Sequence, residues 1–259
     1  MLIAHISDTH ISAPDPEEPK FLERIRTLET FVAHINALEE KPDLVLHTGD
    51  VTHGGTPEYY AIVHSIMEKL GVPSYFSLGN RDKAANLVAG LGDLGGAKLA
   101  DGFLIYSIDD FPVRLVAMDT QHSESNMGST CEKRLKILDE LLKEQPDTPT
   151  ALFMHHPPFE ITTSKYRFQF EDMELAEQLL EVIGRHKQVV HLFGGHAHRH
   201  YTYDLVGCHA TLVPSLPVDN RLGDFEDGLK DHPLYLMHRW HPDTRSFESA
   251  LHAADVDKP

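Results

Sequence analysis

The sequence Val189-Val190-His191-Leu192-Phe193-Gly194-Gly195-His196-Ala197-His198 joins a strand-like apolar run to two imidazoles that could bind a metal. Four other apolar runs end in the same way. Residues 2–6 precede Asp8 and His10, residues 44–46 precede Asp50, residues 75–78 precede Asn80, and residues 151–154 precede His155 and His156. Because the carboxyl ends of parallel strands meet at one edge of a sheet, we expect these side chains to form a single site.

Seven of these side chains carry oxygen or nitrogen ligands that suit hard or borderline divalent metals: Asp8, His10, Asp50, Asn80, His155, His196 and His198. Seven ligands are too many for one tetrahedral ion and match two ions that share a carboxylate. Alternation along an extended strand end would place Asp8 and His10 on the same side, and His196 and His198 likewise. The sequence therefore predicts a dinuclear metal centre.

The composition sets limits on the class of protein. The chain has 259 residues, 41% of them hydrophobic, which suits one large domain or one domain with a small appendage. No apolar run approaches the roughly 18 residues of a membrane helix, and residues 1–8 resemble a first strand more than a signal peptide. The two cysteines, Cys131 and Cys208, form no C-x-x-C pair. We expect a reducing, cytoplasmic location and no membrane partner.

The charge of the chain excludes one class of partner. The net charge is -17, from 23 basic and 40 acidic side chains. Such a surface repels a polyanion, so we expect no long nucleic acid as a partner. A small phosphate ester remains compatible, because bound divalent ions reverse the local potential.

The rest of the chain alternates predicted strands and helices through residue 213. Helices are expected over residues 17–40, 57–70, 130–144 and 172–185, a hairpin over 103–108 and 113–118, and late strands over 201–206, 208–213, 235–240 and 246–251. This pattern predicts an α/β fold in which two mixed sheets pack as a sandwich with helices outside. We expect residues 1–213 to form the catalytic domain. Residues 214–259 would be a C-terminal irregular and β extension, continuous with it, that acts as a lid or an oligomer contact.

The combined motifs closely resemble the signature of the calcineurin-like metallophosphoesterases. They are Asp8-x-His10, Gly49-Asp50, Gly79-Asn80-x-Asp82, His155 and Gly195-His196-x-His198, in the family order. The flanking residues 2–10 and 153–158 are most similar to the bacterial class III branch, the cyclic-nucleotide and glycerophosphodiester phosphodiesterases. This resemblance implies a four-layer α/β/β/α metallophosphoesterase sandwich with a dinuclear site.

The resemblance also implies how the ligands divide between two divalent ions drawn from Mn, Fe, Zn and Co. The first ion would be held by Asp8, His10, Asp50 and His198. The second would be held by Asp50, Asn80, His155 and His196, so that Asp50 bridges the two ions.

One position departs from the family pattern, because Arg81 stands where the family usually has histidine. Arginine can form two charge-assisted hydrogen bonds to phosphate oxygens, but it does not readily release a proton. Arg81 either faces the site and stabilises the phosphoryl group, or turns away into a salt bridge with Asp82 or another acid. If it faces the site, His156 or a water would protonate the leaving group. Asp82 is expected to orient a neighbouring group.

The activity implied by the resemblance is hydrolysis of small phosphodiesters, of the glycerophosphodiester or cyclic-nucleotide type. A metal-bound hydroxide would attack phosphorus in line with the leaving group, and Arg81 would neutralise charge on the phosphoryl oxygens. Arg221 would either add a phosphate contact or lie solvated at the surface. The alternatives are a phosphomonoesterase or nucleotide phosphatase with the same site and, less favoured, a non-catalytic binding scaffold. Similar relatives often assemble, so we expect a homo-oligomer, a dimer or larger.

Overall fold

The computed structural model describes residues 1–205 and 207–255. The last residue of the expected strand 201–206 and the last four residues of the expected extension 214–259 lie outside the described residues.

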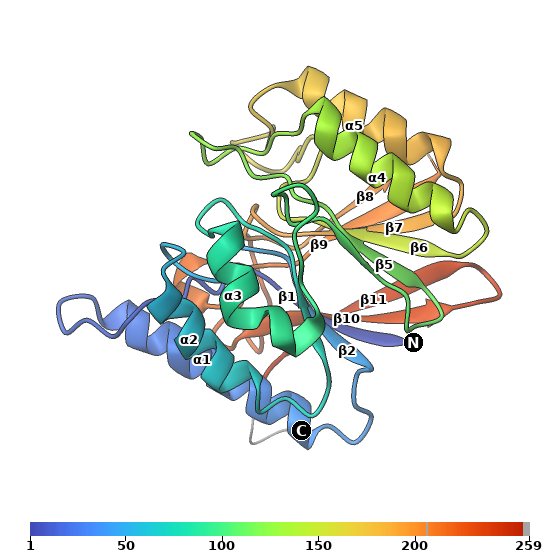
Figure 1. The fold of residues 1–259 in the computed structure, drawn as a ribbon. Coiled ribbons are helices and arrows are strands. Elements are labelled where there is room, and N and C mark those ends of the chain that lie inside the picture. The colour runs from blue at the N-terminus through green and yellow to red at the C-terminus, as the bar shows by residue number, and fades with distance from the viewer. Residues whose placement is uncertain (206, 256–259) are drawn as a thin grey trace.

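Two mixed β-sheets pack face to face, as expected (Figure 1). The first sheet has the order β11-β10-β1-β2-β3 and the second has the order β4-β5-β6-β7-β9-β8. The first consists of β1 (Leu2–Ile6), β2 (Leu44–His47), β3 (Ser74–Phe76), β10 (Leu234–His241) and β11 (Ser246–Ala253). The second consists of β4 (Tyr106–Ile108), β5 (Arg114–Ala117), β6 (Thr150–Phe153), β7 (Val189–Gly194), β8 (Tyr201–Leu205) and β9 (Cys208–Leu212).

The strand directions bring the carboxyl ends of several strands to one end of the sandwich. In the first sheet β1, β2 and β3 run parallel, and in the second sheet β5, β6, β7 and β9 run parallel. The strands β4, β8, β10 and β11 pair in antiparallel fashion with their neighbours. The expected hairpin is therefore confirmed as β4–β5, and the parallel central strands all point to the same edge.

Helices cover the outer face of each sheet and complete four layers (Figure 1). The helices α1 (Pro19–Ala37), α2 (Pro57–Met67) and α3 (Ala84–Gly95) lie beside the first sheet, and α4 (Glu132–Glu144) and α5 (Met173–Arg185) lie on the second. The first helix buries the apolar side chains of Leu28, Phe31, Val32 and Ile35. That helix also buries Arg24, which a purely apolar stripe does not explain.

The helix α3 is absent from the sequence expectations, because its three glycines obscure the helical pattern. Leu87 and Leu91, one turn apart, are its buried residues. One of these glycines is required by packing. A Cβ at Gly95 would lie 1.9 Å from the carbonyl oxygen of Ser74. Close packing on β3 therefore requires glycine at this position despite the cost to helix propensity.

The C-terminal part of the chain contributes directly to the first sheet. Residues 236–239 of β10 pair with residues 2–5 of β1, with Leu2 opposite Arg239, and β11 forms the edge. The segment before β10 contains the short 3₁₀ helix η1 (Val218–Asn220). Among the described residues, no helix combines the length and apolarity that a membrane span requires.

Candidate metal centre

The structure brings the seven expected ligand residues together beyond the carboxyl ends of β1, β2, β3, β6 and β7. Three groups of side chains have ligand atoms within 4.8 Å of one another. The groups are Asp8, His10 and His198; Asp8, Asp50 and His155; and His155, His156 and His196. Asn80 joins them through its amide oxygen, which lies 3.2 Å from Nε2 of His155.

The backbone presents these side chains in a different way from the one that the sequence suggested. The expected alternation along a strand end is wrong, because five of the seven residues have left-handed backbone angles. The φ values are 56° at Asp8, 46° at His10, 50° at Asp50, 64° at His196 and 54° at His198. Such conformations cost about 1–2 kcal/mol per residue and cluster at functional sites. Tight left-handed turns at the strand ends therefore aim these groups inward.

The first group contains buried polar atoms that a bound cation would satisfy. Nε2 of His198 lies 3.1 Å from Oδ1 of Asp8, and Nε2 of His10 lies 3.6 Å from Oδ2 of Asp50. Among the described residues, Asp8 Oδ1 and His10 Nε2 are buried without a hydrogen-bond partner. Buried polar atoms rarely stay unpaired, so this donor set fits a divalent metal.

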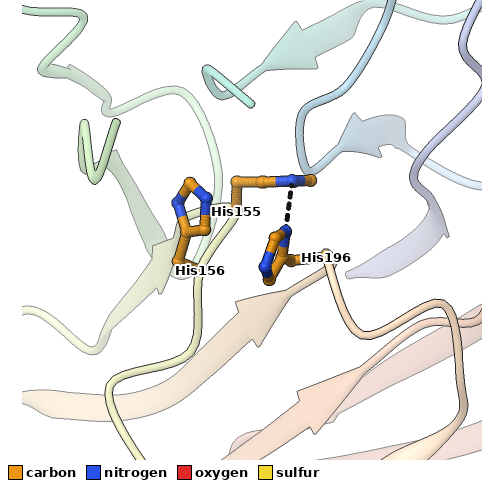
Figure 2. A group of neighbouring side chains, drawn as sticks. All are labelled: His155, His156 and His196. Carbon is orange, nitrogen blue, oxygen red and sulfur yellow. Dashed lines mark hydrogen bonds between the residues drawn. The ribbon is translucent and has the colours of Figure 1, made fainter. Parts of the chain in front are cut away.

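Hydrogen bonds to backbone carbonyls fix the tautomers of two imidazoles. A carbonyl oxygen only accepts, so Nδ1 of His155 donates to Thr48 O at 2.7 Å and Nδ1 of His198 donates to Asn220 O at 2.6 Å. The Nε2 atom of a neutral imidazole in this tautomer carries a lone pair, as metal ligation requires. His155 Nε2 also lies 3.2 Å from Nδ1 of His196 (Figure 2). The lone pair of His155 and the amide oxygen of Asn80 therefore face each other across a gap that suits a cation.

The electrostatics of the two carboxylates point to the same conclusion. Burial and the neighbouring Asp8 carboxylate raise the pKa of Asp50 to about 8. Burial acts in the same direction on Asp8, but His198 and His155 outweigh it and lower the pKa of Asp8 well below its ordinary value. Burial opposes the charged form of His198, yet Asp8 raises the pKa of His198 to about 9. In the metal-free site, bound protons must therefore offset the negative charge of the Asp8 and Asp50 carboxylates. Two divalent ions would offset the same charge.

Asp82 is completely buried and holds the neighbouring loops together. Its carboxylate accepts hydrogen bonds from the backbone N–H groups of Val51, Thr52 and Gly79 at 3.1 Å each, and from the hydroxyl of Tyr60 at 2.9 Å. Burial and the charge of Asp50 raise the pKa of Asp82 to about 6 against these donors. Its contacts are those of a group that orients its neighbours.

His156 packs beside the site without facing it. Its ring lies 4.4 Å from the ring of His196, measured between centroids (Figure 2). Nε2 donates to the carbonyl oxygen of Asn126 at 3.2 Å, so Nδ1 accepts from the hydroxyl of Thr120 at 2.9 Å. Both ring nitrogens are therefore engaged, and neither is free to face a substrate.

Arg81 lines the cavity at the site. This cavity has a volume of about 250 Å³, and its lining includes several candidate ligands. The alternative in which Arg81 turns away into a salt bridge with Asp82 or another acid is not seen, because within the described part of the chain the Arg81 guanidinium has no ion pair or hydrogen bond. Its backbone N–H donates to Oδ1 of Asp50 at 2.7 Å. The side chain is exposed and remains available to an anion.

The cavity also contains residues that the sequence analysis missed: Arg24, His53, Asn126 and Asn220. His53 lies three residues after Asp50 on the same loop, and this closeness in sequence was the one local sign that it could reach the cavity. Nδ2 of Asn80 donates to Oδ1 of Asn126 at 3.4 Å. Arg24 and Asn220 come from distant segments, and no local motif marks them.

Arg221 is neither a phosphate contact nor a solvated surface residue. Its guanidinium donates to four backbone carbonyls, those of Ser215, Leu216, Lys230 and His232. Burial lowers the pKa of Arg221 to about 10. This side chain therefore ties together the irregular segment that runs past the site.

Comparisons with known proteins agree with this geometry. The family model for calcineurin-like phosphoesterases matches residues 1–200. A protein of Arcobacter nitrofigilis, named a probable glycerophosphodiester phosphodiesterase, is 33% identical over 200 residues, which cover 77% of this chain and 72% of the relative. A 3',5'-cyclic-nucleotide phosphodiesterase of Nostoc is 28% identical over 218 residues, which cover 82% of this chain and 77% of the relative.

The fold has counterparts among solved structures. A dimetal phosphatase from Danio rerio superimposes with a TM-score of 0.67 over 98% of this chain and 99% of that chain, at 14% identity. At this identity the likeness concerns the fold alone, and it confirms the expected sandwich. From the family match over residues 1–200, we conclude that the chain belongs to the calcineurin-like phosphoesterase family, whose members are metal-dependent phosphoesterases.

Proposed function

We propose that this chain hydrolyses small phosphodiesters at a dinuclear metal centre. The observation that carries the proposal is the convergence of seven ligand-type side chains, with buried polar atoms of Asp8 and His10 left without a hydrogen-bond partner among the described residues. Asp8, His10, Asp50 and His198 would hold the first ion. Asp50, Asn80, His155 and His196 would hold the second.

The metals are divalent ions drawn from Mn, Fe, Zn and Co, since the donor set contains oxygen and imidazole nitrogen but no thiolate. Two such ions would supply an activated water and offset the charge of the phosphoryl oxygens. The protein's own part is to orient the ligands. The carbonyls of Thr48 and Asn220 hold two imidazoles in the ligating tautomer, and Asp82 fixes the loops that carry Asp50 and Asn80.

Arg81 is the proposed phosphoryl contact. Its guanidinium has no acidic partner in the described chain, lines the cavity and can form two hydrogen bonds to phosphate oxygens. It would stabilise charge that grows on these oxygens during the reaction. The contacts of His156 support a positioning role toward His196, which leaves His53 or a water to protonate the departing alkoxide.

The substrate proposal rests on the cavity and on the relatives. A cavity of about 250 Å³ has room for a small ester. Relatives carry the names glycerophosphodiester phosphodiesterase and cyclic-nucleotide phosphodiesterase. We therefore favour glycerophosphodiesters or cyclic nucleotides over phosphomonoesters.

The first experiment compares the two ester classes. Chelated protein is reloaded in turn with Mn²⁺, Co²⁺, Zn²⁺ and Fe²⁺, and rates are measured on bis(p-nitrophenyl) phosphate and p-nitrophenyl phosphate. We expect the diester to be hydrolysed faster. A faster monoester rate would instead favour a phosphomonoesterase, and activity on neither ester with no bound metal would favour a scaffold.

The second experiment removes proposed ligands. Asp50→Ala and His196→Ala should abolish hydrolysis and lower the metal content, while His241→Ala, at a partly exposed position on β10, should change neither. Full activity in a metal-poor Asp50→Ala protein would contradict the proposed mechanism.

We also propose a cytoplasmic location and a homo-oligomer. The free cysteines, Cys131 and Cys208, support a reducing environment. Residues 1–213 would carry the catalytic site, and the C-terminal extension would act as a lid or an oligomer contact. Light scattering on the full chain and on a variant altered at the exposed Val218 would measure the mass and test this segment.

A further inference from the structure

Arg24 is a buried arginine that the proposed reaction does not itself require. It lies on α1, and its side chain is 6% exposed. Nε and Nη2 donate to the two carboxylate oxygens of Asp219 at 3.2 Å and 2.7 Å. Burying a guanidinium is costly unless it is paired in good geometry, and this bidentate pair provides that geometry. The pair joins α1 to a segment 195 residues further along the chain.

Asp219 belongs to η1, and the next residue contacts the metal centre. The carbonyl of Asn220 accepts the 2.6 Å hydrogen bond from Nδ1 of His198. In return, the backbone N–H of Leu222 donates to the carbonyl of His198 at 2.8 Å. A continuous path of contacts therefore runs from Arg24 through Asp219 and Asn220 to His198.

The carbonyl of Asn220 determines which ring nitrogen of His198 is available as a metal ligand. It accepts the hydrogen bond of the Nδ1 proton, so Nε2, which points toward Asp8, is the ring nitrogen left to bind a metal. His198 lies on a left-handed turn, at φ 54°, so its own backbone gives it no strand partner that would fix the ring. The orientation of the ring therefore depends on where η1 sits.

We propose that Arg24 and Asp219 form a positioning pair that sets the affinity of the first metal ion through His198. This inference rests on the proposed function, in which His198 is a ligand of the first ion and not of the second. The second ion has a separate anchor, because His155 donates to Thr48, at the end of β2. Loss of the pair should therefore weaken one metal equivalent and spare the other.

A direct contact between Arg24 and substrate is the competing explanation, since Arg24 also lines the cavity. Its Nε and Nη2 atoms are already bound to Asp219. A substrate contact would change KM and leave metal binding alone, whereas a positioning residue changes metal binding before any substrate is present.

The test measures metal binding by the full chain without substrate. Chelated protein is titrated with Co²⁺ and followed by calorimetry and by the visible absorption of bound cobalt. The wild type should bind two equivalents. Arg24→Met and Asp219→Ala should each bind one equivalent about 10- to 100-fold more weakly and the other with unchanged affinity. The cobalt spectrum of the weakened equivalent should change.

A matched control exists in the second sheet. Arg114 is buried like Arg24, and its Nε donates to Asp109 at 2.7 Å, but the pair lies at the opposite end of the strands from the site. Asp109→Ala should lower the thermal midpoint without weakening either cobalt equivalent. If Asp219→Ala fails to fold, Asp219→Asn, which keeps the shape and one acceptor oxygen, should show the same loss in smaller measure.

Four outcomes would overturn the inference: both equivalents unchanged in Arg24→Met and Asp219→Ala, equal weakening of both equivalents, the same loss in Asp109→Ala, or a rise in KM alone. A wild-type protein that binds no cobalt would instead contradict the proposed function itself, so the two failures are distinguishable.

Discussion

The hydroxyl of Tyr60 donates a 2.9 Å hydrogen bond to Oδ1 of Asp82, from a helix to the loop beyond β3. The same carboxylate binds the backbone N–H groups of Val51, which follows Asp50, and of Gly79, which precedes Asn80. Burial and the charge of Asp82 raise the pKa of Tyr60, so the phenol remains a donor. One buried carboxylate thus fixes the spacing of two proposed ligands, and Tyr60 fixes the carboxylate.

Tyr60→Phe should lower both stability and metal affinity. It removes one donor from a buried carboxylate, which should lower the free energy of unfolding by about 1–2 kcal/mol. It should also weaken metal binding about tenfold. Tyr106→Phe is the control. The buried hydroxyl of Tyr106 donates to the carbonyl oxygen of Phe76 at 2.8 Å, and this bond lies away from the site. Denaturant unfolding and cobalt titration of both variants measure the effects. Equal metal affinity in the two variants would count against this role of Tyr60.

Arg81→Ala should lower turnover without lowering metal content. The backbone N–H of residue 81 keeps its bond to Asp50, so only the guanidinium is lost. Removing one preorganised charge from the site should reduce kcat on bis(p-nitrophenyl) phosphate about 10²- to 10³-fold. Lys83→Ala removes an exposed cation two residues away and should retain the wild-type rate. An unchanged rate in Arg81→Ala would show that the guanidinium does not act on the substrate.

The sequence predicted which side chains meet at one end of the sandwich because local patterns carry that information. An apolar run followed by Asp, Asn or His marks the end of a buried strand, and parallel strands bring such ends together. The mixed sandwich followed from the same alternation of strands and helices, together with the β4–β5 hairpin. These features depend on residues that are neighbours in the chain.

The features that escaped prediction depend on distant contacts. The left-handed turns at Asp8 and His196 are set by the closing of the site and not by residue type, since aspartate and histidine do not require them. Likewise, the pairing of Arg24 with Asp219 and the binding of Arg221 to four carbonyls join segments that no periodicity relates. Sequence spacing thus indicated which groups meet, and only the fold shows what holds them.

Gly79→Ala should disrupt the site more than its size suggests. A Cβ at this position would lie 1.9 Å from the backbone nitrogen of Asp50 and 2.3 Å from Oδ1 of Asp50, so the two loops would have to separate. We expect lower stability and loss of metal binding, measured by thermal unfolding and cobalt titration. Gly184→Ala, in α5 with open space around it, should stabilise the protein by about 0.5–1 kcal/mol. Normal metal binding in Gly79→Ala would show that the loops can separate without harm.

The histidines inside the sandwich should make stability depend on pH. Nδ1 of His5 lies 3.2 Å from Nε2 of His238, and burial lowers the pKa of both well below the ordinary value. Burial, and to a smaller extent His209, lowers the pKa of His191 to about 3. Well above pH 6.5 these groups are neutral in both states and contribute no pH dependence. Below pH 6.5 these histidines bind protons in the unfolded chain but stay neutral in the folded chain. The free energy of unfolding therefore falls with falling pH.

His191→Phe isolates one such group. Protonation of this histidine in the unfolded chain, with a pKa of about 6.5, lowers the free energy of unfolding by about 2 kcal/mol at pH 5. The substitution removes this contribution. Urea unfolding of metal-free protein between pH 5 and 8 should therefore show a shallower fall for His191→Phe than for the wild type. The absolute stability also changes, because the hydroxyl of Thr211 loses its 3.0 Å partner, so the comparison concerns the slope. Parallel curves below pH 6.5 would mean that His191 is protonated equally in both states.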